Sequence, residues 1–203
     1  MKVYQVSVGP MQNFSYIVED ESTHETIVID PSWDLEKLTE IINEQNLNPK
    51  YIVNTHWHDD HTRGNEELAK ELSVKIVQHS ASQLKNDLTV SDGDSIKFGC
   101  SELAVYHTPG HSKDSICLVG DGKIFSGDTL FVGNCGRIDL PGGSAKELYH
   151  GLFDVIANLS DDLVLYPGHD YGSSSTSTIG KEKQTNPVMQ KMSENEFVER
   201  MGG

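Results

Sequence analysis

The sequence THWHDDHTRGN spans residues 55–65 and stands where an apolar strand gives way to a polar loop. It places four potential metal ligands, namely His56, His58, Asp60 and His61, within six residues. Imidazole and carboxylate groups together suit zinc, iron or manganese. In an extended chain His56 and His58 point to one side, while Asp60 and His61 lie past the bend and can turn toward a second centre. The spacing therefore predicts two metal ions rather than one.

Three more candidate ligands follow other predicted strands, and each comes after a glycine. They are His111 in TPGH, Asp128 in SGD and His169 in YPGH. Glycine lets the backbone bend sharply and approach a crowded site. A single histidine at a strand end is usually a surface or hydrogen-bonded residue, so it is the clustering that favours a metal site. The histidines outside these motifs are interpreted as surface or hydrogen-bonded residues rather than ligands: His24, His79, His107 and His150. Of these, His107 is expected to pack or hydrogen-bond near the site.

The four motifs THWHDDHTRGN, TPGHS, SGDTLF and YPGHDY occur in this order along nearly the whole chain. They resemble the successive metal-binding motifs of the metallo-β-lactamase superfamily. The resemblance implies an α+β fold, a four-layer αββα sandwich, formed by residues 1–203 as a single domain with a short polar C-terminal extension from about residue 173. It also implies a ligand set: His56, His58 and His111 on the first metal, Asp60, His61 and His169 on the second, and Asp128 bridging both.

Two segments narrow the resemblance within the superfamily. CGR at 135–137 and GHDY at 168–171 are similar to the glyoxalase II and persulfide dioxygenase branch, whose members act on glutathione-type thioesters or persulfides. The ending STIGKEKQTNP is similar to that of short members, so the helical C-terminal domain with which classical glyoxalase II holds glutathione is not expected. Arg63 and Asp114 depart from the small residues common at their positions, and they are expected to alter the charge and width of the pocket.

The resemblance implies hydrolysis by a metal-bound hydroxide as the main prediction. Two divalent ions, zinc first and iron or manganese as alternatives, lower the pKa of a bridging water from about 16 toward neutrality. Asp60 is the expected catalytic residue, because it would orient the hydroxide while one metal stabilises the oxyanion. The expected substrate is a thioester of a small thiol.

The alternative reaction needs a single ferrous ion. The pattern of persulfide dioxygenases, carried onto this chain, implies iron on His56, His111 and Asp128 and oxidation of a glutathione-type persulfide. The sequence does not separate the two reactions, because iron and zinc share these ligands. A non-catalytic member with a degenerate site is a third possibility, and the intact ligand set argues against it.

Residues beside the motifs are candidates for substrate contact. Arg137 either clamps a substrate carboxylate or pairs with Asp139, and Tyr171 either faces the substrate or packs. Cys135 is a redox-sensitive thiol or, more commonly for such a residue, a small packed side chain. Asp30 is expected as a turn residue or as a hydrogen-bond partner of a ligand.

Composition limits the class of partner. A chain of 203 residues with 36% hydrophobic content fills the core of one domain. Its 31 acidic and 16 basic residues give a net charge of −15, which repels nucleic acid and anionic membranes. A small-molecule thioester or persulfide is the expected partner, and the oligomeric state stays open. Three widely spaced cysteines and a start without a signal peptide favour a reducing cytoplasm.

Hydrophobic patterning predicts the order of elements. Strands are expected at residues 2–8, 15–19, 26–30, 51–53, 75–78, 95–98, 102–107, 115–119, 123–125 and 163–166, the last being the final strand. Helices are expected at residues 34–45, 65–72, 145–156, 179–184 and 194–201. The first three strands form an expected antiparallel meander, and Asp121-Gly122 predicts a hairpin. Two β-rich halves with helices predict two sheets packed face to face, with the site along one edge.

Overall fold

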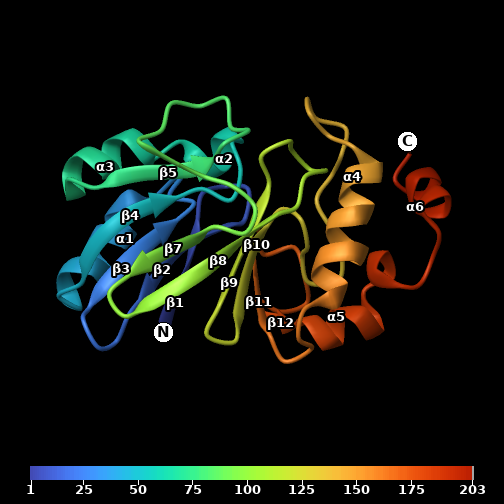
Figure 1. The fold of residues 1–203 in the computed structure, drawn as a ribbon. Helices are drawn as coiled ribbons and strands as arrows, with labels where there is room; N and C mark the ends of the chain where they lie inside the picture. Colours follow the sequence, from blue (N-terminus) through green and yellow to red (C-terminus); the bar gives the residue numbers. More distant parts are fainter. Residues whose placement is uncertain (203) are drawn as a thin grey trace.

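The computed structural model describes residues 1–202 as four layers, in the order helices, sheet, sheet, helices (Figure 1). The first sheet has the strand order β1-β2-β3-β4-β5-β6, with β1 Lys2–Val8, β2 Asn13–Glu19, β3 Glu25–Ile29, β4 Asn48–Val53, β5 Lys75–His79 and β6 Leu88–Val90. The second has the order β12-β11-β10-β9-β8-β7, with β7 Ser95–Phe98, β8 Ser101–His107, β9 Ile116–Gly120, β10 Lys123–Gly127, β11 Val164–Pro167 and β12 Ser177–Thr178. This arrangement confirms the predicted αββα sandwich.

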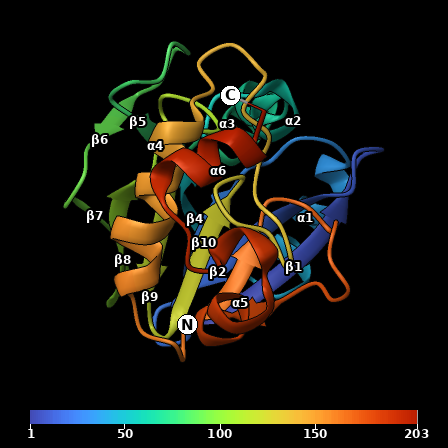
Figure 2. The ribbon, with the colours of Figure 1, turned by 90° about the vertical axis from the view of Figure 1, so that its right-hand side faces the viewer.

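Helices cover the outer face of each sheet. Helices α1 (Leu35–Glu44) and α3 (Asn65–Leu72) lie on the first sheet, and Figure 2 shows α4 (Ala145–His150), α5 (Ile179–Thr185) and α6 (Glu194–Arg200) in front of the second. A short helix, α2 (Asp59–Thr62), follows β4. None of the helices in residues 1–202 is long and apolar enough to cross a membrane.

Alternation along the strands divides the apolar side chains between layers. In β3, Ile27 and Ile29 join the core between the two sheets, whereas Val28 faces the helices of the first sheet. Strands β1, β2 and β3 pair antiparallel, which confirms the predicted meander, and β3 to β6 pair parallel with α1 and α3 as crossovers. The β9–β10 hairpin turns at Asp121 and Gly122, both with positive φ, as predicted.

Besides the short helix α2 and the 3₁₀ turn Pro187–Met189, which were not predicted, three parts of the sheets and helices differ from the sequence prediction. Strand β6 was not predicted, because only Val90 of its three residues is buried and three residues show no periodicity. Residues 163–166 are not the final strand, since the two-residue β12 pairs with β11 beyond it. The helix predicted over 145–156 ends as an α-helix at His150 and continues as a π-helical turn (Gly151–Val155) and a 3₁₀ turn (Ile156–Asn158).

The C-terminal segment packs on the second sheet. The helices predicted at 179–184 and 194–201 are present as α5 and α6, and a 3₁₀ turn (Pro187–Met189) lies between them. Ile179 and Phe197 are fully buried in the same core as Leu148 of α4. Residues 179–201 therefore complete the outer layer over this sheet.

The candidate ligands meet at one edge of the sandwich. Strand pairing orients β8, β10 and β11 in the same direction, so the segments that follow them leave the second sheet at the same edge. Across the sandwich, the amide of Ile116 donates to the carbonyl of Thr55, 2.9 Å away, just after β4. The end of β4 and α2 therefore lie beside these three segments (Figure 1).

Candidate metal centre

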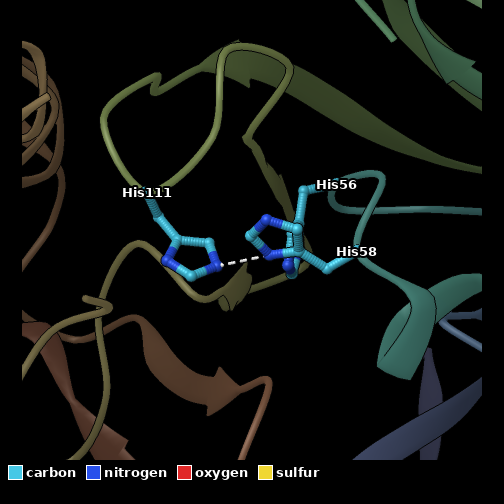
Figure 3. A group of neighbouring side chains, drawn as sticks. All are labelled: His56, His58 and His111. Carbon is cyan, nitrogen blue, oxygen red and sulfur yellow. Dashed lines mark hydrogen bonds between the residues drawn. The ribbon is translucent and has the colours of Figure 1, made fainter. Parts of the chain in front are cut away.

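The structure brings six of the seven predicted ligands together in two groups of three. The ligand atoms of His56, His58 and His111 all lie within 4.8 Å of one another (Figure 3). Those of Asp60, His61 and His169 form a second group with the same limit. The chain is extended at His58 and then turns into α2. This bend separates the two sets of side chains, as the sequence predicted.

Asp128 lies between these two groups. Its Oδ2 is 3.5 Å from Nε2 of His111 and 3.3 Å from Nε2 of His169, and its Oδ1 is 3.4 Å from Nε2 of His61. A carboxylate in this position is able to contact a metal in either group. The bridging role stays a prediction, and the geometry is compatible with it.

Hydrogen bonds orient the histidine rings toward the centre. Three rings place Nδ1 against an acceptor, so that Nε2 faces inward, an arrangement common among metal-binding histidines. The acceptors are the carbonyl of Arg137 for His111 at 2.7 Å, the carbonyl of Met11 for His169 at 2.9 Å, and the carboxylate of Asp30 for His61 at 3.0 Å. His58 instead presents Nδ1, which lies 2.9 Å from Nε2 of His111.

Buried atoms without partners test whether the site suits a metal. Within residues 1–202, Nε2 of His56, Nε2 of His58 and Oδ1 of Asp128 are buried and make no hydrogen bond. A buried polar atom left unpaired is costly, by about 1–3 kcal/mol each. Metal coordination would satisfy Nε2 of His56 and Oδ1 of Asp128, because imidazole nitrogen and carboxylate oxygen are ligands for zinc and iron, whereas His58 faces the centre with Nδ1 and its Nε2 is not the ligand atom. The donor set fits a metal ion.

The electrostatics of the two groups differ. Burial lowers the pKa of His56 well below its usual range and that of His58 to about 4, so both rings are neutral, as a metal ligand must be. Burial also acts on His169, but the charge of Asp128 and the hydrogen bonds to Asp128 and Asp60 together outweigh it and raise the pKa of His169 to about 9. Burial opposes ionisation of Asp128 as well, yet His61 and His169 hold its pKa well below the usual range. A metal in the second group therefore has to displace protons.

Of the two expected roles of Asp30, turn residue or hydrogen-bond partner of a ligand, the structure shows the hydrogen-bond partner. It is buried at the end of β3 with φ 51°, and its carboxylate accepts hydrogen bonds from the amide and hydroxyl of Thr55 at 2.7 and 2.6 Å. The same carboxylate holds His61, as described above. Asp30 thus supports two candidate-ligand segments.

Asn13 was missed by the sequence reasoning. It is buried at the start of β2, and its Nδ2 donates to the carbonyl and to Oδ2 of Asp60, both at 3.0 Å. Asn13 and Asp60 are 47 residues apart, and nothing local to Asn13 indicates a role in the site. Only the fold makes this contact visible.

A cleft of about 260 Å³ opens over the centre. Besides five of the candidate ligands, its lining consists of Met11, Phe131, Asn134, Cys135, Arg137, Leu140 and Tyr171. The two predicted substrate residues, Arg137 and Tyr171, therefore both line the cleft. Their contact with a substrate stays a prediction.

The contacts of Arg137, Tyr171 and Cys135 bear on the alternative roles that the sequence left open for them. Nε and Nη2 of Arg137 both donate to the carboxylate of Asp139, so the scaffold ion pair is present. The ring of Tyr171 stacks on that of His169 with centroids 4.5 Å apart. Cys135 is buried, and burial raises the pKa of its thiol to about 12, which fits a packed residue rather than a reactive thiolate.

The two departures from the family pattern lie outside the cleft lining. Arg63 pairs with Asp59 at 3.1 Å and lies over the ring of Trp33. Asp114 is buried and accepts a hydrogen bond from the hydroxyl of Ser112 at 2.7 Å. Neither lines the cleft in the described part of the chain, and their effect on the charge and width of the pocket stays a prediction.

Comparison with known proteins places the chain in a family. The model of the Metallo-beta-lactamase superfamily matches residues 8–83 and 78–169. The human protein "Persulfide dioxygenase ETHE1, mitochondrial" is 36% identical over 193 residues, which cover 93% of this chain and 76% of the relative. A hydroxyacylglutathione hydrolase of Tolumonas auensis is 37% identical over 172 residues, covering 82% and 66%. The crystal structure of ETHE1 from Myxococcus xanthus matches with a TM-score of 0.95 at 30% identity, covering 100% of this chain and 91% of that one. The chain belongs to the metallo-β-lactamase superfamily, in the branch of glyoxalase II and persulfide dioxygenase.

Proposed function

We propose that this chain is a mononuclear iron dioxygenase that oxidises the persulfide of a small thiol. The observation that carries the proposal is the similarity to a persulfide dioxygenase along 93% of the chain. Two imidazoles and one carboxylate, from His56, His111 and Asp128, offer a set of ligands that is typical of non-heme Fe(II) oxygenases. The proposal reverses the order of the two reactions that the sequence motifs suggested.

A ferrous ion held by these three residues would supply the redox chemistry by which both atoms of dioxygen are added to the terminal sulfur, so that no external reductant is needed. The protein holds the ligand rings in position and lines the cleft with apolar side chains. The carbonyl of Arg137 fixes the ring of His111, and the hydroxyl of Thr55 lies 3.1 Å from Nδ1 of His56. Tyr171 and Phe131, with ring centroids 5.5 Å apart, form an apolar wall suited to sulfur.

A second candidate function is the hydrolysis of a thioester by two metals. The group formed by Asp60, His61 and His169 favours it, because these residues could hold a second ion next to Asp128. The similarity to a hydroxyacylglutathione hydrolase points to the same reaction. In the dioxygenase Asp60 and His169, which line the cleft, would serve as hydrogen-bonding groups for the substrate.

Metal content and oxygen uptake distinguish the two functions. The protein is purified without added metal and its iron and zinc are quantified. Oxygen consumption is then followed with glutathione persulfide, and thioester cleavage with lactoylglutathione. We expect about one iron per chain and rapid oxygen uptake. Two zinc ions per chain with thioester turnover and no oxygen uptake would reject the dioxygenase in favour of the hydrolase.

A further inference from the structure

A second cavity, of about 110 Å³, lies beside the metal centre. Three of its lining residues adjoin the site in sequence: Trp57 stands between two candidate ligands, Lys113 is two residues after His111, and Pro141 follows Leu140 of the cleft wall. The full lining is Trp57, Ala81, Gln83, Lys113, Pro141 and Gly142. The cavity is therefore a neighbour of the reaction centre built from the same loops.

The polar groups around this cavity are suited to an anion. The indole N–H of Trp57 and the ammonium of Lys113 are donors without acceptor capacity. Within residues 1–202 neither group, nor the amide of Gln83, has a hydrogen-bond partner in the protein, and the side chains of Lys113 and Gln83 are exposed to solvent. None of the lining residues is acidic, although the chain has 31 acidic residues. Unpaired donors without a carboxylate of their own form a place for a carboxylate from outside.

Two cationic side chains lie next to the centre in residues 1–202, and they differ in their ion pairs. The guanidinium of Arg137 is engaged by Asp139, whereas Lys113 makes no ion pair in the described part of the chain. The backbone of Lys113 is hydrogen-bonded, and its side chain is exposed. Its carbonyl lies 2.8 Å from Nε2 of His107, and its side chain runs past Gly142, where an added Cβ would lie 3.5 Å from the Cγ of Lys113.

We propose that this cavity, the Trp57–Lys113 subsite, binds a carboxylate of the substrate's thiol carrier while the sulfur reaches the metal centre. The volume is that of about three to four water molecules, which suits a carboxylate with its neighbouring carbon and excludes a nucleotide. The subsite predicts a thiol carrier that has a free carboxylate. The identity of the reacting sulfur rests on the proposed function, and the carboxylate subsite does not.

The test uses Trp57 as a reporter. The chain has two tryptophans, Trp33 and Trp57, so the variant Trp33→Phe leaves the subsite residue as the one source of indole fluorescence. This variant, with its metal, is titrated with S-methylglutathione, a non-reacting thioether that carries two carboxylates. We expect a saturable change in emission. Lys113→Glu in the same background should raise Kd about tenfold, because an attraction becomes a repulsion.

Two controls sharpen this measurement. Lys70→Glu makes the same charge reversal on the exposed face of α3, away from the cavity, and should leave Kd within about twofold. The dimethyl ester of S-methylglutathione, in which both carboxylates are masked, should bind as weakly to the reference protein as the free acid binds to Lys113→Glu. Equal Kd values for the two lysine variants, or no saturable emission change, overturn the subsite.

Oxygen uptake with glutathione persulfide separates this proposal from the dioxygenase itself. If the reference protein consumes oxygen, Lys113→Glu should raise KM about tenfold and leave kcat within about twofold, since the subsite does not touch the reacting atoms. An unchanged KM rejects the subsite and leaves the dioxygenase standing. A saturable, Lys113-dependent emission change without oxygen uptake rejects the dioxygenase and leaves the subsite standing.

Discussion

Asp30 is a buried carboxylate that connects two candidate ligands without facing the cleft. It accepts a hydrogen bond from the hydroxyl of Thr55, which itself lies 3.1 Å from Nδ1 of His56, and it also contacts Nδ1 of His61. Partners of this kind fix the orientation of metal-binding rings and raise their basicity. The charge of Asp30 therefore acts on the centre through Thr55 and His61.

The variant Asp30→Asn tests this connection. We expect metal affinity to fall about 10- to 100-fold, because one amide cannot accept from all three donors as the carboxylate does. Chelator competition measures the affinity. The matched control is Asp59→Asn, an exposed neighbour of the ligands whose loss breaks a surface ion pair with Arg63 and should change affinity little. Equal effects of the two variants would contradict the role of Asp30.

His111 and His169 should differ in their effect on iron. In the mononuclear proposal His111→Ala removes a ligand, so we expect iron to be lost and oxygen uptake to fall more than about a hundredfold. His169→Ala removes a hydrogen-bonding group, so iron should stay near one per chain while the rate falls about tenfold. Elemental analysis of both purified variants measures this. Loss of about half the metal in His169→Ala, from two ions per chain to one, supports the hydrolase instead.

His79 should make stability depend on pH. It is buried and stacks on His107 with centroids 4.0 Å apart, and burial, together with that neighbour, lowers its pKa to about 4. An unfolded histidine titrates near 6.5, so between about pH 6.5 and pH 4 the unfolded chain binds more protons. The free energy of unfolding therefore falls as pH decreases through this window, by at most about 1.4 kcal/mol per unit.

The variant His79→Gln isolates this contribution. The difference in unfolding free energy between the parent protein and the variant should shrink by about 2 kcal/mol from pH 7 to pH 4.5, as followed by urea denaturation. A difference that does not vary with pH would show that His79 has an ordinary pKa in the folded protein.

At the scale of elements, Gly110 couples the loop of His111 to α4. It has φ +139°, and an added Cβ would lie 2.2 Å from the backbone nitrogen of Leu148. The amide of Ser144, which caps α4, donates to the carbonyl of Gly110 at 2.7 Å. The N-terminal turns of α4 therefore rest directly on the ligand loop, and no side chain fits between them.

Gly110→Ala should both destabilise the protein and disturb the centre. We expect a loss of about 3 kcal/mol in unfolding free energy, from backbone strain and from overpacking, with reduced metal content. Gly93→Ala is the matched control, because Gly93 also has positive φ, at +80°, but no atom lies within 4 Å of the added Cβ. Its cost should be near 1 kcal/mol, with metal content unchanged. Similar losses in both variants would mean that strain alone is responsible.

Elements with a strong local pattern were predictable, and elements made by tertiary pairing were not. Helix α1 follows from the spacing of Leu38 and Ile42, both buried. Strand β12 is held by pairing with β11, which no local pattern of two residues encodes. The site shows the same division. His56 and His58 stand out by their spacing, whereas the contact of Asn13 with Asp60 depends on the whole sheet.

At the scale of the whole molecule, the candidate centre joins the two sheets. His56 and His58 follow β4 of the first sheet, and His111, Asp128 and His169 follow strands of the second. Backbone hydrogen bonds cross at the same edge, from Phe14 to the carbonyl of Gly168 at 2.9 Å as well as from Ile116 to Thr55. A bound metal would thus add a connection between halves that already share a core.

Removal of the metal should therefore lower the stability of the entire molecule. A ligand that binds only the folded state stabilises by RT ln(1 + [L]/Kd), which is about 2.7 kcal/mol at a hundredfold excess over Kd. For a chain of this length that corresponds to about 5–10 °C in Tm. Calorimetry before and after treatment with a chelator should show one transition that moves down as a unit, because the two sheets share one apolar core. His111→Ala, which is expected to lose its metal, should not respond to the chelator. Two separate transitions after chelation, one per sheet, would show instead that the shared apolar core does not couple the halves and that the metal is what joins them.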